Sequence, residues 1–388
     1  MLLDGERPIS ARVRRIGAPV LRLRAEQHGC EAIDICVTTL TGLEDYCRPA
    51  APCALLKAAV VAFGLVGEGT LSTAGTSGRG GRSRSRSGGD GGAAAPSPSP
   101  RVAATEGDEG GGPSLADALL NGPAASGLEI ATRSELPTGS GMGTSSILAG
   151  ALLSALGAAV GKRVGGASLV HLVLRVEQMM TTGGGWQDQV GGLLPGAKIA
   201  RSAAALPLRV ATAPIALPAG FAATLSRRLL LVFTGRQRLA RNLLMDVLRR
   251  WAARPPEITR TVRALTANAE ACAVALAEGD AERVGACLAK YWAHKVAMAP
   301  GCEPEFVRAM MHALAPLTAG QALCGAGGGG FLVALLHDGA SHADARTALD
   351  AAGALGPAGG GASDVSFHTA TVDETGLQLT LGDDHEPL

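Results

Sequence analysis

Apolar residues recur at helical spacing in several parts of the chain. Within residues 145–161, SSILAGALLSALGAAVG, the apolar side chains that fall on or near one stripe are Ile147, Leu148, Leu152 and Leu156. This spacing predicts an amphipathic helix that begins just after a glycine-rich segment. Further helices are expected at residues 55–66, at residues 167–180 and over most of residues 238–318.

Extended segments are indicated by alternation of apolar and polar residues or by short apolar runs next to glycine. Residues 127–136 alternate well enough for a strand, and residues 227–235, RRLLLVFTG, form a run typical of a buried strand. Residues 322–336 read as a glycine loop that leads into a strand. Two weaker strands are expected in the tail, at residues 365–373 and 376–381. Because strands interleave with helices, the predicted fold class is α+β.

The chain of 388 residues is long enough for two domains, which we place at residues 1–225 and 226–388. Residues 67–113 depart from the pattern, since they hold almost no large apolar side chains and cannot offset the entropy of folding. We expect them to form a disordered low-complexity insertion. We interpret their RSRSRS run, residues 82–87, as a solvated linker rather than an RNA-binding or phosphorylated segment.

Charge and cysteine content narrow the classes of function. The formal net charge of +1 gives no general attraction to nucleic acid or to an anionic membrane. The eight cysteines form no C-x-x-C pair and have no histidines at zinc-finger spacing, so we expect free thiols in a reducing compartment. The N-terminus lacks a signal-peptide core, and the apolar stretch 54–67 is too short to span a bilayer. A cytoplasmic protein is predicted.

The segment GSGMGTSS, residues 139–146, follows a predicted strand and precedes a predicted helix. Glycines allow close backbone approach, and a helix N-terminus presents unpaired N–H groups, so this order suits a phosphate. The segment is neither a Walker A loop, because it has no lysine, nor a G-x-G-x-x-G fingerprint. A helix capped by Ser or Thr after a flexible turn is the alternative.

Two more segments carry candidate chemistry. The loop CGAGGGGF, residues 324–331, implies close backbone approach to another segment or to a ligand, with a hinge as the alternative. In the predicted loop 181–196, Asp188 lies between two glutamines and could accept a hydroxyl proton; an Asx turn is the alternative. Glu177 lies near the C-terminal end of its predicted helix, where the helix dipole disfavours a carboxylate. A compensating cation such as Mg²⁺ would explain this position, and a solvated Glu is the alternative.

Together these segments resemble the motifs of the GHMP small-molecule kinases. SELPTGSGMGTSS resembles the family motif P-x-x-x-G-[LM]-G-[ST]-S-[SA], and GAGGGGF resembles the C-terminal glycine motif. GGGWQDQVGG resembles the aspartate-bearing segment of the sugar-1-kinase branch. The resemblance implies an N-terminal domain like ribosomal S5 domain 2, a C-terminal ferredoxin-like domain, and ATP between them.

The resemblance also implies residue roles. Asp188 is expected to be the catalytic base, and the Mg²⁺ neighbourhood is expected to comprise Ser145, Ser146 and Glu177. The residues expected to bind the ATP phosphates are Gly139, Ser140, Gly141, Met142, Gly143, Thr144, Ser145, Ser146, Gly325, Ala326, Gly327, Gly328 and Gly329.

Longer flanking matches, such as LRVEQMMTTGGGWQDQVGGLLPGAKIARS, resemble the fucose kinases within this family. They imply transfer of the γ-phosphate of ATP to the anomeric hydroxyl of L-fucose, in fucose salvage toward GDP-fucose, with no nucleic-acid or membrane partner. A heptose-phosphate kinase is one alternative. The other is a nucleotide-binding module without catalysis. That reading is favoured by the missing first family motif, P-x-R-x-D-x-x-G-G, which predicts a chain truncated at its N-terminus.

Overall fold

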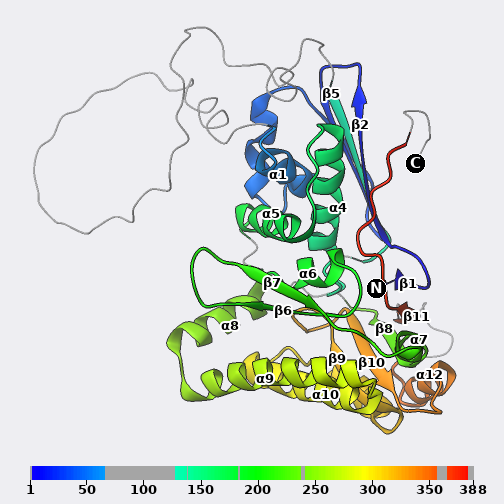
Figure 1. Ribbon diagram of the computed structural model, residues 1–388. Helices are drawn as coiled ribbons and strands as arrows, with labels where there is room; N and C mark the ends of the chain where they lie inside the picture. Colours follow the sequence, from blue (N-terminus) through cyan, green and yellow to red (C-terminus); the bar gives the residue numbers. More distant parts are fainter. Residues whose placement is uncertain are drawn as a thin grey trace, which may run out of the picture.

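The computed structural model describes residues 2–65, 127–137, 139–181, 184–236, 241–355 and 365–382. In these residues two separate mixed layers of helix and sheet lie one above the other (Figure 1). The insertion expected at residues 67–113 lies outside the described part of the chain.

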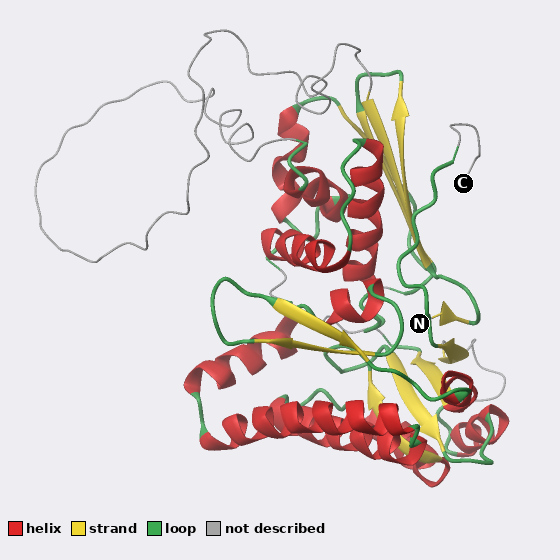
Figure 2. Ribbon diagram, in the orientation of Figure 1, coloured by secondary structure: helices red, strands yellow, loops and turns green. Residues whose placement is uncertain are grey.

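The first sheet has four strands in the order β2-β5-β3-β4. Its strands are β2 (Ile9–Ile16), β3 (Leu21–Gln27), β4 (Ile33–Val37) and β5 (Gly127–Ser134). Strand β5 pairs antiparallel with β2 and parallel with β3, and seven of its eight residues are buried. One face of this sheet is covered by helices, as Figure 2 shows, and they are α1 (Ala54–Ala62), α4 (Thr144–Ala159) and α5 (Gly166–Met179). Leucines on β3 and β5 pack there against the apolar stripe of α4.

The second sheet has five strands in the order β1-β11-β8-β10-β9, and every pair in it is antiparallel. Its strands are β1 (Leu2–Leu3), β8 (Leu229–Thr234), β9 (Thr318–Leu323), β10 (Phe331–Leu336) and β11 (Val365–Thr371). Helix α10 packs directly on β9 because two glycines face each other there. A Cβ on Gly320 would lie 1.8 Å from the carbonyl oxygen of Gly285.

The remaining elements connect or flank the two sheets. The helices are α6 (Gln187–Leu193), α7 (Phe221–Arg228), α8 (Arg241–Ala253), α9 (Pro256–Glu278), α10 (Ala281–Met298), α11 (Glu305–Leu314) and α12 (His342–Ala351). Strands β6 (Lys198–Ser202) and β7 (Val210–Pro214) form a hairpin, and the short 3₁₀ helices are η1 (Leu40–Cys47) and η2 (Ala315–Leu317).

The predicted helices and most predicted strands are confirmed, and two expectations are wrong. Residues 376–381 form no strand, because a turn around Asp373 directs the chain away from the second sheet. The predicted loop 181–196 contains helix α6, and Asp188 lies in its first turn. The domain division at residue 225 stays a prediction. That point falls inside α7, which packs on β11 and β10.

Two findings concern thiols and membranes. All eight cysteines lie in the described residues, and none of them forms a disulfide. Three of them, Cys30, Cys36 and Cys47, are exposed, whereas Cys324 is half-buried in the second glycine loop. Within the described residues, no helix combines the length and apolar character that crossing a bilayer requires.

A buried ion pair in the first layer allows a stability test. The Nζ of Lys57, on α1, is 2.6 Å from the Oδ1 of Asp45, and the Lys57 side chain is only 6% exposed. We expect Asp45→Ala to lower the free energy of unfolding by about 3 kcal/mol, because it leaves a buried ammonium without its partner. Lys57→Met, which removes the charge and keeps the volume, is expected to be nearly neutral. Urea unfolding of both variants measures the difference, and equal losses would contradict this account.

Candidate phosphate-transfer site

Helix α4 begins at the first glycine loop, and no described side chain caps it. Its N-cap residue, Gly143, has φ +69°, a left-handed conformation that favours glycine. The Ser140 hydroxyl bonds to the Thr144 hydroxyl instead of capping the helix. The capped-helix alternative is therefore not what the structure shows. The first-turn N–H groups and the positive end of the helix dipole remain open to an anion.

The second glycine loop lies directly against the first. The backbone N–H of Phe331 donates to the carbonyl oxygen of Ser140 at 2.9 Å. A Cβ on Gly141 would lie 2.6 Å from the carbonyl oxygen of Cys324, so side chains are excluded where the loops meet. The two candidate segments, about 180 residues apart in the sequence, thus form one site.

In the middle of the second loop, the glycines serve packing within their own layer. A Cβ on Gly327 would lie 2.7 Å from the Cβ of Cys302. The N–H of Gly328 donates to the Cys302 carbonyl and is not available to a phosphate. The second loop therefore contacts the first at its two ends, near Gly325 and near Gly330.

Asp188 lies beside the first loop. A Cβ on Gly143 would come within 3.0 Å of the Asp188 Cβ and 3.1 Å of its carboxyl carbon, which places this acid at the N-terminus of α4. Burial raises the pKa of Asp188, and the positive charge of Lys295 partly opposes that rise. A carboxylate with a raised pKa is a better proton acceptor at neutral pH than an exposed one.

Glu177, Ser146 and Gln189 form a buried polar cluster next to Asp188. The Ser146 hydroxyl donates to one carboxylate oxygen of Glu177, and Gln189 Nε2 donates to the other at 2.6 Å. Burial raises the pKa of Glu177, and the nearby Asp188 charge adds to the rise. Gln189, which follows Asp188 in the sequence, thus binds Glu177.

The cluster fits a hard divalent cation. Hydroxyl and carboxylate oxygens are ligands that Mg²⁺ prefers, and the buried Oε1 of Gln189 has no hydrogen-bond partner among the described residues. Those residues contain no group of three His, Cys, Asp or Glu side chains that could hold a metal. Mg²⁺ commonly takes one or two carboxylates and completes its shell with phosphates and water, so one carboxylate suffices here. Ser145 is exposed and lies outside this cluster.

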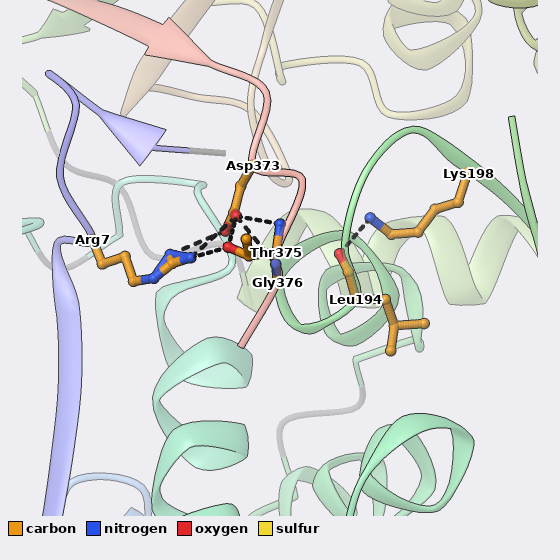
Figure 3. Close-up of polar contacts among 6 residues, drawn as sticks. All are labelled: Arg7, Leu194, Lys198, Asp373, Thr375 and Gly376. Carbon is orange, nitrogen blue, oxygen red and sulfur yellow. Dashed lines mark hydrogen bonds and ion pairs between the residues drawn. The ribbon is translucent and has the colours of Figure 1, made fainter. Parts of the chain in front are cut away.

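The C-terminal segment 372–382, here called the strap, carries the Asp373 contacts drawn in Figure 3 and reaches the far end of α6. The Asp373 carboxylate accepts hydrogen bonds from Arg7, from both the hydroxyl and the N–H of Thr375, and from the N–H of Gly376. The Leu377 N–H donates to the carbonyl of Leu193, the last residue of α6. The helix that carries Asp188 is therefore anchored at its C-terminal end.

A cavity of about 830 Å³ opens beside Asp188. Its lining includes Gly141, Asp188, Gly325, Tyr291 and strap residues such as Leu377. This volume falls in the usual range for small-molecule sites. The first glycine loop, the Asp188 carboxylate and this cavity thus lie next to one another.

The structure adds contacts that sequence reasoning missed. Lys295 is buried and bonded to the second loop, Gln189 holds Glu177, and the Arg7–Asp373 pair anchors the strap. Each of these contacts joins residues far apart or on different elements, and none of them leaves a local sequence motif.

Comparisons with known proteins give the class. The family model for the GHMP kinases N terminal domain matches residues 114–196. The solved structure of L. major mevalonate kinase in complex with R-mevalonate aligns over 95% of this chain and 87% of its own, with a TM-score of 0.53 and 15% identity. Residues 114–196 therefore match the model of the GHMP kinases N terminal domain, and the chain has the two-domain fold of these kinases, as the sequence predicted.

Within this class, two relatives are fucokinases. The chain is 37% identical to the Bifunctional fucokinase/GDP-fucose pyrophosphorylase of Arabidopsis thaliana over 224 residues, 58% of this chain and 21% of that protein. It is 31% identical to the L-fucokinase/L-fucose-1-P guanylyltransferase of Bacteroides fragilis over 221 residues, 55% of this chain and 22% of that protein. The chain thus spans about a fifth of the length of these relatives.

The strap anchor carries a pH-dependent prediction. Burial alone would raise the pKa of Asp373, but the hydrogen bonds from Thr375 and Gly376 and the charge of Arg7 outweigh it and hold the pKa below its ordinary value. A carboxylate whose pKa is lower in the folded than in the unfolded state stabilises the fold at pH values above its unfolded pKa, about 3.9. This stabilisation is lost as the pH falls through the folded-state pKa. We expect Asp373→Asn to cost about 1–2 kcal/mol between pH 8 and 5 and less below about pH 4. Chemical unfolding across this range tests it; a cost that grows on acidification would contradict it.

Proposed function

We propose that this chain is an ATP-dependent sugar kinase region that phosphorylates L-fucose at its anomeric hydroxyl. The observation that carries the proposal is the position of Asp188. It lies against Gly143 at the open N-terminus of α4 and faces a cavity of sufficient size for a sugar. The names of the two fucokinase relatives support L-fucose as the acceptor. A cytoplasmic location belongs to the same proposal, because the reaction consumes ATP.

In the proposed mechanism, the first glycine loop and the N-terminus of α4 bind the ATP phosphates through backbone N–H groups. Asp188 accepts the proton of the anomeric hydroxyl as that oxygen attacks the γ-phosphorus, and ADP leaves with the bridging oxygen. Ser146 and Glu177 would hold Mg²⁺, which neutralises phosphate charge when bound. The protein's own contribution is chiefly positioning and electrostatic stabilisation.

The experiment is a measurement of ADP release by the purified chain with Mg-ATP and one sugar at a time. The panel holds L-fucose, L-galactose, D-mannose and a heptose phosphate. We expect turnover with L-fucose to exceed that with the other three. Turnover confined to the heptose phosphate would overturn the choice of sugar. ATP binding without turnover of any sugar would favour a nucleotide-binding module instead.

A further inference from the structure

The strap is fixed at its root and carries exposed leucines beyond it. Leu377 packs against the apolar core of the first layer, and its N–H is bonded to the end of α6. Residues 378–382 make no hydrogen bond to any other described residue. Leu379 and Leu381 are 45% and 72% exposed. Two apolar side chains are therefore left in solvent on a segment that has no backbone partner among the described residues.

The strap runs along an unpaired edge of the first sheet. Strand β2 is the outermost strand, and it pairs with β5 on one side and with no described strand on the other. The strap is anchored next to the start of β2, because Asp373 binds Arg7, and it runs in the same direction as β2 (Figure 1). The free edge of a strand exposes N–H and C=O groups that can pair with a further strand.

The cavity of about 830 Å³ borders on both segments. Its lining includes residues 9–13 of β2 and residues 377–382 of the strap. Helix α4 contributes four alanines that share one face of the helix, namely Ala151, Ala155, Ala158 and Ala159. The cavity therefore adjoins a strand edge, a segment without backbone partners among the described residues, and small side chains that leave room for larger ones.

The strap has the sequence pattern of a strand. In residues 377–381, LQLTL, leucines alternate with polar residues, so Leu379 and Leu381 project to the same side as Leu377 when the segment is extended. Leu377 already packs on the core that residues of α4 and β2 also contact. Residues 377–382 span about 20 Å when extended, which is most of the length of an eight-residue strand such as β2.

We propose that the strap is a lid of the transfer site. It closes when residues 378–382 pair as a strand with the free edge of β2, and Leu379 and Leu381 then enter the alanine-lined part of the cavity. The described strap is in the open position. The four alanines lie in the C-terminal half of α4, whereas Asp188 lies at its N-terminus, so a closed strap leaves space for the sugar.

The use of such a lid rests on the proposed function, whereas its closure follows from the geometry alone. A cavity of 830 Å³ has the volume of about 28 water molecules. Water beside a transfer site competes with the sugar for the γ-phosphate, and closure of a lid expels it. The closed strap therefore favours transfer to the sugar over hydrolysis of ATP.

A disulfide trap tests closure without turnover. Leu379→Cys is combined either with Ala11→Cys or with Val13→Cys, because these β2 residues contact the same core as Leu377. Neighbouring residues of paired strands have Cα atoms about 5 Å apart, within the range of a disulfide. Oxidised glutathione is the oxidant, and peptide mass spectrometry identifies the link. The exposed native cysteines are first replaced by serine, and these are Cys30, Cys36 and Cys47.

We expect a disulfide in at least one of these pairs, formed at least about tenfold faster than in a control pair. The control combines Leu379→Cys with Leu248→Cys, because α8 and the strap lie on opposite sides of the molecule (Figure 1). Labelling with a maleimide shows that both thiols of each pair are accessible. If neither strap–β2 pair links faster than the control, although its thiols are labelled, the strap does not close and the proposal is overturned.

The coupling of ATP use to sugar phosphorylation tests what closure does. The double variant Leu379→Ser, Leu381→Ser removes the side chains that enter the cavity. Leu248→Ser is the matched control, since Leu248 is 43% exposed on α8. We expect KM for L-fucose to rise about tenfold in the double variant, together with the share of ADP released without sugar phosphate, while KM for ATP changes less than about twofold. Thermal unfolding checks that both variants fold.

The same KM for L-fucose and the same share of uncoupled ADP in the double variant and in Leu248→Ser would overturn the lid. Absence of turnover in the unaltered chain counts against the proposed function alone, because the disulfide trap still decides whether the strap closes on β2.

Discussion

Replacement of Asp188 by asparagine is expected to lower L-fucose-dependent ADP release by about a thousandfold. Asparagine keeps the size of the side chain and its place against Gly143, but its amide cannot accept the hydroxyl proton. Loss of a general base costs about 10²–10⁴ in rate. We expect the loss in kcat, with the affinity for ATP nearly unchanged, because the N–H groups that we propose to bind the phosphates come from the first glycine loop and α4.

The same variant makes a prediction about stability. Burial raises the pKa of Asp188, so the folded protein disfavours its ionised form, and Asp188 destabilises the fold increasingly as pH rises through its unfolded value. Asp188→Asn should therefore be at least as stable as the parent at pH 7. Asp246→Asn, a change of an exposed carboxylate on α8, is the control for both assays. Full turnover in Asp188→Asn, or a marked drop in its melting temperature, would contradict the assigned role.

The parts of the fold that were predicted from sequence are those with strong local patterns. The apolar stripe of residues 145–161 identified α4, and the run LLLVFT identified β8. Strand β3, LRLRAEQ, was missed by the residue pattern alone, because its arginines and its Glu26 resemble a solvated segment. In the structure those polar positions pair across the sheet, for example through Arg22 and Asp34 at 2.7 Å. Such cross-strand compensation depends on a partner that the local sequence does not specify.

The tail shows the opposite error. Residues 376–381 alternate Leu with polar residues, which favours a strand, but no edge of either sheet receives them. Instead, Gly376 passes so close to the end of α6 that a Cβ on it would lie 2.8 Å from the Pro195 nitrogen. Alternation reports which side chains share a face and does not report whether a pairing strand exists.

The residues of the candidate site also differ in whether a local sequence pattern predicts them. Glycine-rich loops are visible in sequence because few other residues tolerate their geometry, so both loops and the nearby Asp188 were found. Lys295 was not found, since a single lysine in a helix is usually solvated and its partner Gly325 lies 30 residues away. The roles assigned to the individual loop residues stay predictions, and Gly328 already has its N–H bonded within its own layer.

The contact between the two glycine loops leads to the second large expected effect, in Gly325→Ala. Gly325 has φ +63°, which costs an alanine about 1–2 kcal/mol wherever it occurs. Here the added Cβ would also lie 2.6 Å from the Gly141 Cα and 3.2 Å from its carbonyl oxygen. Both contacts are with backbone, so no side-chain rotation relieves them, and the first glycine loop must shift. A misplacement of about 1 Å in a transfer site costs about a hundredfold in rate.

The variant Gly339→Ala separates the effect of backbone strain from the effect of a steric clash. Gly339 has φ +84°, and an added Cβ would meet no atom within 4 Å, so its alanine variant carries the same kind of backbone strain in open space. We expect Gly339→Ala to lose about 1–2 kcal/mol of stability with kcat unchanged, and Gly325→Ala to lose more stability and about a hundredfold in kcat. Unfolding free energies and L-fucose-dependent ADP release measure both. If the two variants behave alike, the two glycine loops do not constrain each other, and the first loop is positioned by its own layer alone.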